Sequence, residues 1–233
     1  LLQSQHTWVY RMCHKCIHID ILLQSHKQLN KTYGKYNKLR TVHNGINPNA
    51  IRQATSVTEF SGFQPDHIHI GFVGRLEPVK RLDIFLEMAK LLVDLRQSKP
   101  LQFHIFGYGS LEEKMKLLCT RLELEDSTIF HGHRKDVYAC IQSLDAVVMC
   151  SDHEGLPMTA LESLALNTPI LTRNIGGLQN LLKAYPRWTT NGHDPSDYAK
   201  LVMNVIHDTP QSIEYPENYH IRNTATQTVE FYQ

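Results

Sequence analysis

The sequence predicts an α/β fold in which a doubly wound parallel sheet is covered by helices on both faces. From about residue 67 onward, short β-rich runs alternate with longer segments of helical periodicity. Such alternation is typical of parallel sheets built from right-handed crossovers. The chain has 233 residues, of which 42% are apolar and 20% charged, as in an ordinary globular protein of one large domain or one domain plus part of another.

The predicted elements follow one another regularly. The strands are short apolar runs, expected at 67–74, 101–107, 127–132, 146–150 and 169–172. The helices carry an apolar stripe at helical spacing and are expected at 79–96, 110–122, 135–143, 158–166, 178–184 and 196–207. Ser110 and Glu113 have the spacing of a capping box at the start of the second of these helices.

The remaining segments are expected to belong to other units. Residues 1–46, with a helix-like opening over 1–12 and strands at 17–23 and 40–43, resemble the tail of a preceding α/β unit. Residues 47–66 are expected to be an irregular linker, 67–220 the main domain and 221–233 a terminal helix. The chain opens inside an amphipathic stretch without an initiator methionine, so we expect it to be part of a longer protein.

Composition argues against several classes of function. A net charge of +1 offers no footprint for nucleic acid, and no apolar run is long enough to predict a transmembrane helix. Five cysteines, an odd number, without a recognisable signal peptide favour reduced thiols and a cytoplasmic location. Cys13 and Cys16 have the spacing of half a zinc site, but no second ligand pair follows, so we expect an ordinary helix with inward thiols and no metal.

The first loop of interest joins the strand at 67–74 to its helix. Ligands of doubly wound sheets bind beyond the carboxyl ends of the strands. Pro78 suits a first helical position, which would place Lys80 and Arg81 in the first turn. Cations there oppose the helix dipole by roughly 0.3–1 kcal/mol each, a cost that a bound anion would offset. Arg75 could hold the same anion, although two solvated cations at a helix entrance explain the spacing equally well.

Two other loops carry weaker signals. Gly107-Tyr108-Gly109 lacks the third glycine of a dinucleotide fingerprint, so an ordinary turn is favoured. The polar stretch 131–136 could border a nucleobase. Without a nucleotide nearby, a solvated loop whose Asp136 caps the next helix is the simpler interpretation.

The stretch from 151 to 165 carries the strongest signal. Gly155 permits close approach of a ligand, and Pro157 begins a helix whose free amides can face an anion. Glu154 precedes this anion site, and Glu162 lies roughly 7–8 Å along the helix axis beyond it. Two acceptors on either side of an anion suit a sugar nucleotide. A turn residue and a surface helix residue would give the same spacing.

At these residues the chain resembles the C-terminal domain of the retaining family-4 glycosyltransferases, which have the two-domain GT-B fold. Their paired glutamates correspond to Glu154 and Glu162, and their Gly-Arg-Leu…Lys stretch to 74–80. Asn44-Gly45 is similar to their interdomain pair, and 106–111 to their glycine-rich second strand end. The resemblance implies a Rossmann-like C-terminal half with its nucleotide-sugar site over 67–220. It also implies an acceptor-domain tail at 1–46 and a helix crossing back at 221–233.

The resemblance also implies roles for individual residues. Arg75 and Lys80 would hold the donor diphosphate beside Gly74, and Glu154 would orient the transferred sugar. Glu162 would accept the ribose hydroxyls.

Further donor contacts are implied at two loops. Gly155, Leu156 and Met158 would face the sugar or phosphate, and His133 and Arg134 would lie beside the base.

Departures from the family pattern concern supporting positions. Asn167 stands where glycine is usual, but asparagine tolerates a left-handed conformation, so we expect the turn to survive. Gln179 and Asn180 replace the proline and glutamate that often follow the glycine pair Gly176-Gly177, which weakens any role for that loop.

The implied function is transfer of a sugar from a nucleotide-diphosphate sugar to a glycan or lipid-linked acceptor, with retention and without cofactor or metal. A peripheral membrane contact would come through the other domain. Two alternatives stay open at this point: a GT-B nucleotide-sugar epimerase, and a non-catalytic nucleotide-sugar-binding domain.

Overall fold

A computed structural model describes residues 10–12, 15–19, 39–55, 63–95, 98–207 and 212–232. The predictions for 1–9, for Cys13 and for most of the expected strand at 17–23 therefore lie outside or partly outside the described residues.

The main domain is built on a six-stranded sheet in which every pairing is parallel. Its order, β6-β5-β4-β7-β8-β9, reads 3-2-1-4-5-6 when its strands are numbered along the chain. That is the order of doubly wound dinucleotide-binding sheets, so the predicted fold class is confirmed. The strands are β4 (Ile68–Val73), β5 (Leu101–Phe106), β6 (Thr128–Gly132), β7 (Ala146–Met149), β8 (Ile170–Arg173) and β9 (Thr189–Thr190).

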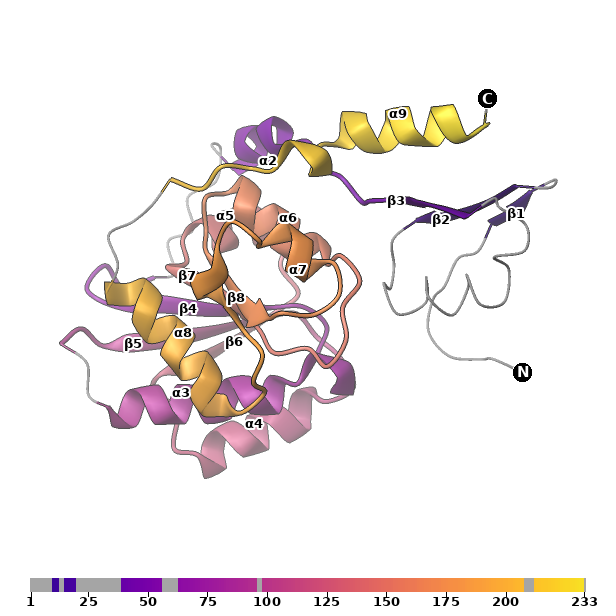
Figure 1. Ribbon diagram of the computed structural model, residues 1–233. Coiled ribbons are helices and arrows are strands. Elements are labelled where there is room, and N and C mark those ends of the chain that lie inside the picture. Colours follow the sequence, from indigo (N-terminus) through magenta and orange to yellow (C-terminus); the bar gives the residue numbers. More distant parts are fainter. Residues whose placement is uncertain are drawn as a thin grey trace, which may run out of the picture.

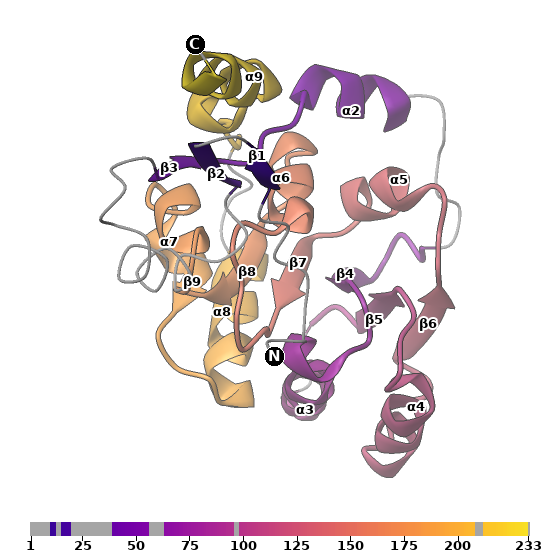
Figure 2. The same ribbon diagram turned by 90° about the vertical axis from the view of Figure 1, so that its right-hand side faces the viewer.

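Helices cover both faces of this sheet (Figures 1 and 2). On one face α3 (Leu82–Asp94) packs against α4 (Glu112–Arg121) and α8 (Pro195–His207). On the other face α5 (Val137–Gln142) and α6 (Met158–Ala165) pack together, and α7 (Leu178–Leu181) follows β8. The core is aromatic where β4, β5 and α3 meet: Phe85 contacts Phe72 and Phe103 edge-on, at centroid distances of 5.7 and 6.1 Å.

A smaller sheet of β1 (Tyr10–Met12), β2 (Lys15–Ile19) and β3 (Leu39–Val42) stands beside the main domain (Figure 1). β1 pairs antiparallel with β2, and β2 pairs parallel with β3. The expected helix over 1–12, and the helix expected around Cys16, are therefore wrong where the structure describes them. These residues are extended because they pair with neighbouring strands, and local periodicity in the sequence does not reveal such pairing.

The C-terminal helix α9 (Ile221–Tyr232) returns to the small sheet and packs against β3. At the crossing point Ile46 and His220 form a parallel bridge. The Thr224 hydroxyl donates to the carbonyl of His43 at 2.9 Å. The division at 46 and 66, and the assignment of α9 to another domain, stay predictions.

The expected irregular linker contains a helix, α2 (Pro48–Thr55). The Asn47 side chain accepts from the amides of Asn49 and Ala50 at 3.2 and 3.3 Å, so asparagine followed by proline starts this helix. The Arg52 side chain donates to the carbonyl of Ala165 at 2.7 Å, which docks α2 on the end of α6. The prediction of irregular structure here is therefore wrong.

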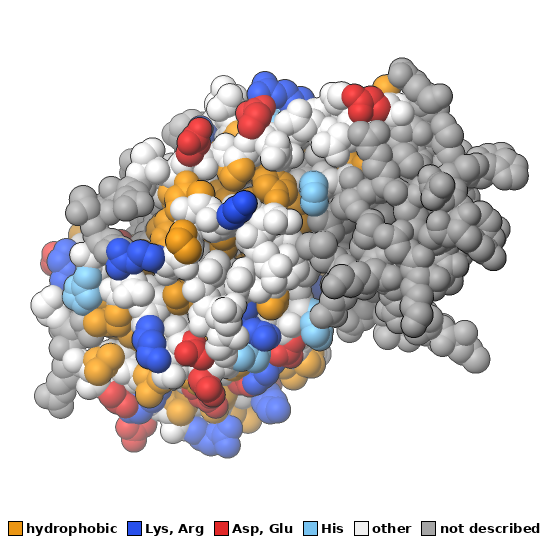
Figure 3. Space-filling view, viewed as in Figure 1, with side chains coloured by type: hydrophobic (Ala, Val, Ile, Leu, Met, Phe, Trp, Pro, Cys, Tyr) orange, Lys and Arg blue, Asp and Glu red, His pale blue; other side chains and the backbone are white. Residues whose placement is uncertain are grey.

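Short elements complete the fold. Single 3-10 turns occur at η2 (Pro78–Lys80), η3 (Pro186–Trp188) and η4 (Glu217–Tyr219). Asn167, between α6 and β8, has φ 63°, as expected for a left-handed turn, and its side chain accepts from the amide of Ile213 at 2.7 Å. No helix in the described part of the chain is long and apolar enough to span a bilayer. Figure 3 shows acidic and basic side chains interspersed on the face seen in Figure 1, in keeping with the net charge of +1.

Candidate functional site

The loops after β4 and β7 form the centre of the candidate site. β4 lies between β5 and β7, so the direction of winding reverses there and the two loops emerge side by side. The amide of Asp152 donates to the carbonyl of Val79 at 2.9 Å, which joins the loops directly. Residues more than seventy positions apart are thus brought to the place where such sheets bind ligands.

Lys80 and Glu154 meet at this junction. The Lys80 Nζ atom lies 2.6 Å from Glu154 Oε1, and the two side chains are only 20% and 8% exposed. The sequence predicted both residues for the donor but not their contact. The protein therefore holds a cation and a carboxylate together in a largely desolvated position.

The predicted cationic first turn of the helix after β4 is wrong. Lys80 closes the 3-10 turn η2, and Arg81 is the N-cap of α3 with φ 50° and ψ 50°. α3 begins at Leu82, and its first turn contains Asp83, which suits the helix dipole. The left-handed Arg81 breaks the helix one residue after Lys80. The dipole penalty therefore does not support an anion site here, and the described partner of Lys80 is the carboxylate of Glu154.

The glycines after β5 serve close backbone packing. Gly107 has φ +134°, and a Cβ built there would lie 1.9 Å from the carbonyl oxygen of Gly74. A Cβ on Gly109 would lie 2.5 Å from the carbonyl oxygen of Leu76. Close backbone packing therefore accounts for both glycines, although the turn itself begins only at Ser110. Gly74 itself is open, since its Cβ would meet nothing nearer than a ring atom of Phe72 at 3.9 Å.

The capping box predicted at the start of α4 does not form. α4 begins at Glu112 without a side-chain cap, and Ser110 turns to Glu77 instead. The Ser110 hydroxyl and amide donate to the Glu77 carboxylate at 2.7 and 3.1 Å, and these bonds lower the pKa of Glu77. The charge of Arg75, which is exposed at the end of β4, adds a smaller lowering effect. Among the described contacts Arg75 is not joined to Lys80 or Glu154.

The loop after β8 supports the backbone that carries Glu154. The amide of Gly177 donates to the carbonyl of Gly155 at 2.6 Å. Gly176 has φ +53°, and a Cβ there would lie 1.9 Å from the carbonyl oxygen of Glu154. The departures at Gln179 and Asn180 predict a weak role for this loop, but its glycine pair packs directly against the backbone of Glu154 and Gly155.

Glu162 is not the surface residue that the simpler alternative required. It is the fifth residue of α6 and lies largely out of water. Burial raises the pKa of its carboxyl, and a hydrogen bond from Tyr138 opposes that rise. At the start of the same helix Pro157 is an extended N-cap, Leu156 is buried and Met158 is 43% exposed. α6 therefore presents a start without a side-chain cap and a partly buried acceptor one turn further along.

The loop after β6 presents an exposed histidine and a fixed arginine. His133 lies edge-on to Tyr108 with ring centroids 5.8 Å apart. Arg134 donates to both carboxylate oxygens of Asp136 at 2.9 and 2.6 Å, which raises the pKa of the guanidinium and lowers that of the carboxyl. Asp136 therefore makes no side-chain cap on α5, contrary to the simpler interpretation of this loop. The loop after β6 thus presents the exposed His133 ring and a guanidinium whose orientation is fixed by Asp136.

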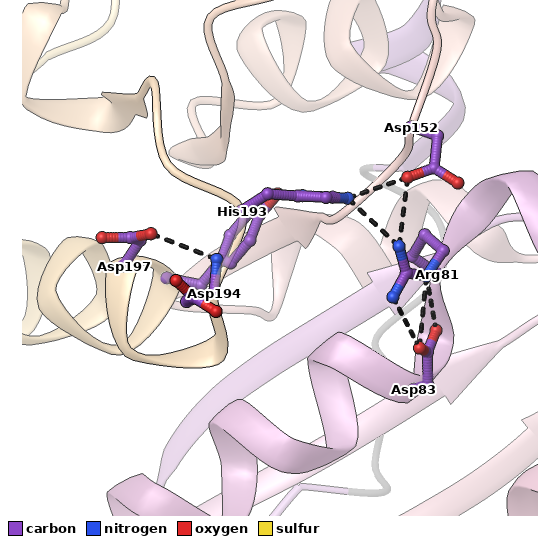
Figure 4. A network of polar contacts seen from close by, with 7 residues as sticks. Arg81, Asp83, Asp152, His193, Asp194 and Asp197 are labelled. Atoms are coloured by element: carbon purple, nitrogen blue, oxygen red, sulfur yellow. Dashed lines mark hydrogen bonds and ion pairs between the residues drawn. The ribbon is translucent and has the colours of Figure 1, made fainter.

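Two polar clusters escaped sequence analysis. One joins Arg81 and Asp152 to His193, which lies 112 residues after Arg81 (Figure 4). The other is a row of rings on β4, β5 and β6. The Nε2 atom of His104 lies 2.9 Å from Nδ1 of His69, and its Nδ1 atom lies 2.9 Å from Nε2 of His131. The only sign of this cluster in the sequence is one polar residue, His69 or His104, in the middle of each of two predicted apolar strands.

Comparison with known proteins gives consistent matches. Residues 56–225 match the family model described as glycosyl transferases group 1. A D-inositol 3-phosphate glycosyltransferase of Corynebacterium urealyticum is 31% identical over 70% of this chain and 42% of its own length. A poly(ribitol-phosphate) alpha-N-acetylglucosaminyltransferase of Staphylococcus aureus is 24% identical over 66% of this chain and 31% of its own length.

Solved structures agree in fold. The Anabaena protein HepE, in complex with UDP and glucose, has a TM-score of 0.79 over 94% of this chain and 62% of its own, at 16% identity. The S. aureus protein TarM gives 0.75 over 94% of this chain and 43% of its own, at 19% identity. These likenesses confirm the predicted Rossmann-like half of a two-domain GT-B architecture. The chain spans about a third to a half of the length of the curated relatives named above.

Proposed function

This chain belongs to the glycosyl transferases group 1 family, and from that premise we propose that it binds the donor of a retaining, family-4 sugar transfer. The donor is a nucleotide-diphosphate sugar, and the acceptor is a glycan or a lipid-linked acceptor. The observation that carries the proposal is the Lys80–Glu154 contact at the point where the sheet reverses its winding. A cation for the diphosphate and an acceptor for sugar hydroxyls stand there within 2.6 Å of one another.

The cations act on the leaving group. As the bond between sugar and diphosphate breaks, negative charge grows on the diphosphate oxygens and positive charge grows at the anomeric carbon. Lys80 and Arg75 stabilise the diphosphate, together with the amides at the start of α6. Once Lys80 has exchanged Glu154 for the diphosphate, these charges need no further rearrangement in the transition state. The same cations do what a divalent metal does in other transferases, so we propose a metal-independent reaction.

The carboxylates orient the donor at its two ends. Glu154 accepts hydroxyls of the transferred sugar, while Gly155, Leu156 and Met158 line its path to the phosphate. Glu162 accepts the ribose hydroxyls.

The base lies at the loop after β6. We propose that the nucleobase packs beside His133 and Arg134. Gly74, which has open space around its Cα, would lie beside the phosphates. The relatives' names differ in acceptor and only one of them names a sugar, so the proposal leaves both at the level of class. We propose a cytoplasmic protein, in keeping with three free, buried cysteines among the described residues. Contact with a membrane surface would come through a facing acceptor domain.

Binding of UDP, GDP and ADP to this chain tests the proposal. The diphosphate that binds most tightly should raise the melting temperature of the protein. Lys80→Ala should lower the affinity for this diphosphate by about ten- to hundredfold, because one charge-assisted contact is worth roughly 1.5–3 kcal/mol. Affinity for the matching nucleoside should not change. Lys90→Ala, which removes an exposed pair with Asp94 on α3, is the matched control. Binding of none of the three, or equal losses for nucleoside and diphosphate, would contradict the proposal.

A further inference from the structure

Three loops from distant parts of the chain meet in one hydrogen-bonded cluster of Arg81, Asp152 and His193 (Figure 4). Arg81 follows Lys80, Asp152 precedes Glu154 by two residues, and His193 lies just before α8. All three positions follow carboxyl ends of strands, and α3 and α8, whose starts carry Arg81 and His193, pack together. The cluster therefore links the backbone of both donor residues to a third, more distant loop.

Arg81 keeps an unfavourable backbone conformation in this cluster. Its φ of 50° is in the left-handed region, where an arginine costs more than a glycine would. Its guanidinium donates to the Asp83 carboxylate through Nε and NH2 at 3.1 and 2.9 Å, and to Asp152 through NH1 at 3.2 Å. Strain of this kind persists when surrounding contacts hold the residue, and here they hold it directly behind Lys80.

His193 supplies the second contact to Asp152. Its Nε2 atom lies 2.8 Å from Asp152 Oδ1. The carboxylate can only accept, so Nε2 carries a proton whether the ring is neutral or charged. The 3.4 Å approach of Arg81 NH1 to the same nitrogen therefore joins two donors and is no hydrogen bond. Nδ1 lies 3.1 Å from the hydroxyl of Tyr198, a fully buried residue of α8 that fixes the ring.

Asp152 thus joins the side chains of Arg81 and His193 to the backbone. Burial alone would raise its pKa, but hydrogen bonds from His193 and Arg81 hold the pKa below its ordinary value. The same residue donates its amide to Val79, one position before Lys80. Its side chain and backbone therefore connect the η2 turn to the loop of Glu154 in two ways.

We propose that Arg81, Asp152 and His193 form a brace that sets the position of Lys80 relative to Glu154 for donor binding. They are positioning residues, since they act through Lys80 and Glu154 and need not touch the donor themselves. The functional part of this inference rests on the proposed donor site, whereas the brace itself is a property of the free protein.

Hydrogen exchange in the ligand-free chain tests the brace. Arg81→Gly removes the guanidinium and also relieves the left-handed strain, so this variant should fold. His193→Leu removes the donor to Asp152, and His193→Gln restores it. We expect the Asp152 amide and residues 151–155 to exchange at least tenfold faster in Arg81→Gly and His193→Leu, and at the wild-type rate in His193→Gln. Lys116→Ala, which breaks an exposed ion pair on α4, is the control. Unchanged exchange in both brace variants would overturn the proposal.

A double-mutant cycle tests what the brace does for the donor. By calorimetry with UDP, or with GDP or ADP if one binds more tightly, Arg81→Gly should lower affinity about tenfold and leave uridine or the matching nucleoside unaffected. Adding Arg81→Gly to Lys80→Ala should cause no further loss, because both act through the same contact. Additive losses would show that Arg81 does not act through Lys80.

The two readouts separate this inference from the proposed function. If exchange responds as expected and no nucleoside diphosphate binds the wild type, the donor site is wrong and the brace stands. If the wild type binds the diphosphate, and neither exchange nor affinity responds to Arg81→Gly, the brace is wrong and the donor site stands.

Discussion

Neutralising Glu154 should strengthen binding of a nucleoside diphosphate. In the free protein Lys80 is held by Glu154 at 2.6 Å, so a diphosphate must compete with this carboxylate for the cation. Glu154→Gln keeps the shape and an acceptor oxygen but removes the negative charge. Lys80 is then free for the phosphate, and repulsion between carboxylate and phosphate is lost as well.

The size of the effect follows from the burial of the pair. Two unit charges about 4 Å apart attract by about 4 kcal/mol at an effective dielectric constant of about 20, before desolvation is subtracted. Exposed pairs are worth about 0.2–1 kcal/mol net, and removing one partner of a buried pair costs about 3–5 kcal/mol. With 20% and 8% of the side chains exposed, this pair lies between those limits. We expect Glu154→Gln to bind the diphosphate more strongly than the wild type by about 1–2 kcal/mol, which is a five- to thirtyfold higher affinity.

Isothermal titration calorimetry of wild type and Glu154→Gln with UDP, or with whichever diphosphate binds, measures this difference. Asp94→Asn is the matched control, because it removes the carboxylate of an exposed pair with Lys90 and should leave the affinity unchanged. In an enzyme assay with the sugar nucleotide, Glu154→Gln should transfer more slowly despite tighter product binding, because the sugar is less well oriented. Weaker or unchanged diphosphate binding by Glu154→Gln would refute the competition between ligand and carboxylate.

Three further outcomes are expected. Burial lowers the pKa of His104 to about 3, so below the unfolded value of 6.5 the unfolded chain binds the proton first and stability falls. Urea unfolding should therefore lose about 1 kcal/mol per pH unit between roughly pH 6 and 4 in the wild type, and less in His104→Gln. Glu162→Ala should weaken UDP by about tenfold but barely affect its 2′,3′-dideoxy analogue, by calorimetry; equal losses would mean that Glu162 acts through stability. Gly107→Ala should fail to fold stably, since its Cβ would lie 1.9 Å from a carbonyl oxygen, whereas Gly132→Ala, with nothing within 4 Å and φ +65°, should lose only about 1–2 kcal/mol in thermal unfolding.

The sequence alone determined the fold class and indicated which loops form the candidate site. Alternation of strand and helix patterns, each readable within a dozen residues, predicts a parallel sheet, and parallel strands place all their carboxyl ends on one edge. Glu154, Gly155 and Pro157 could be recognised because they lie within one loop and the start of one helix. The family resemblance, which has glycine at this position, together with the backbone preference of asparagine, predicted the left-handed Asn167.

Only the tertiary structure decided which of these residues touch. Lys80 meets Glu154 across 74 positions, and His193 meets Asp152 across 41, because β4 and β7 are neighbours and α8 returns to α3. Strand order sets these contacts, and periodicity within a segment does not report it. The same limit explains the wrong predictions near the site. Arg81 ends the η2 turn in a left-handed conformation because Asp83 and Asp152 hold its side chain, and the latter partner is 71 residues away.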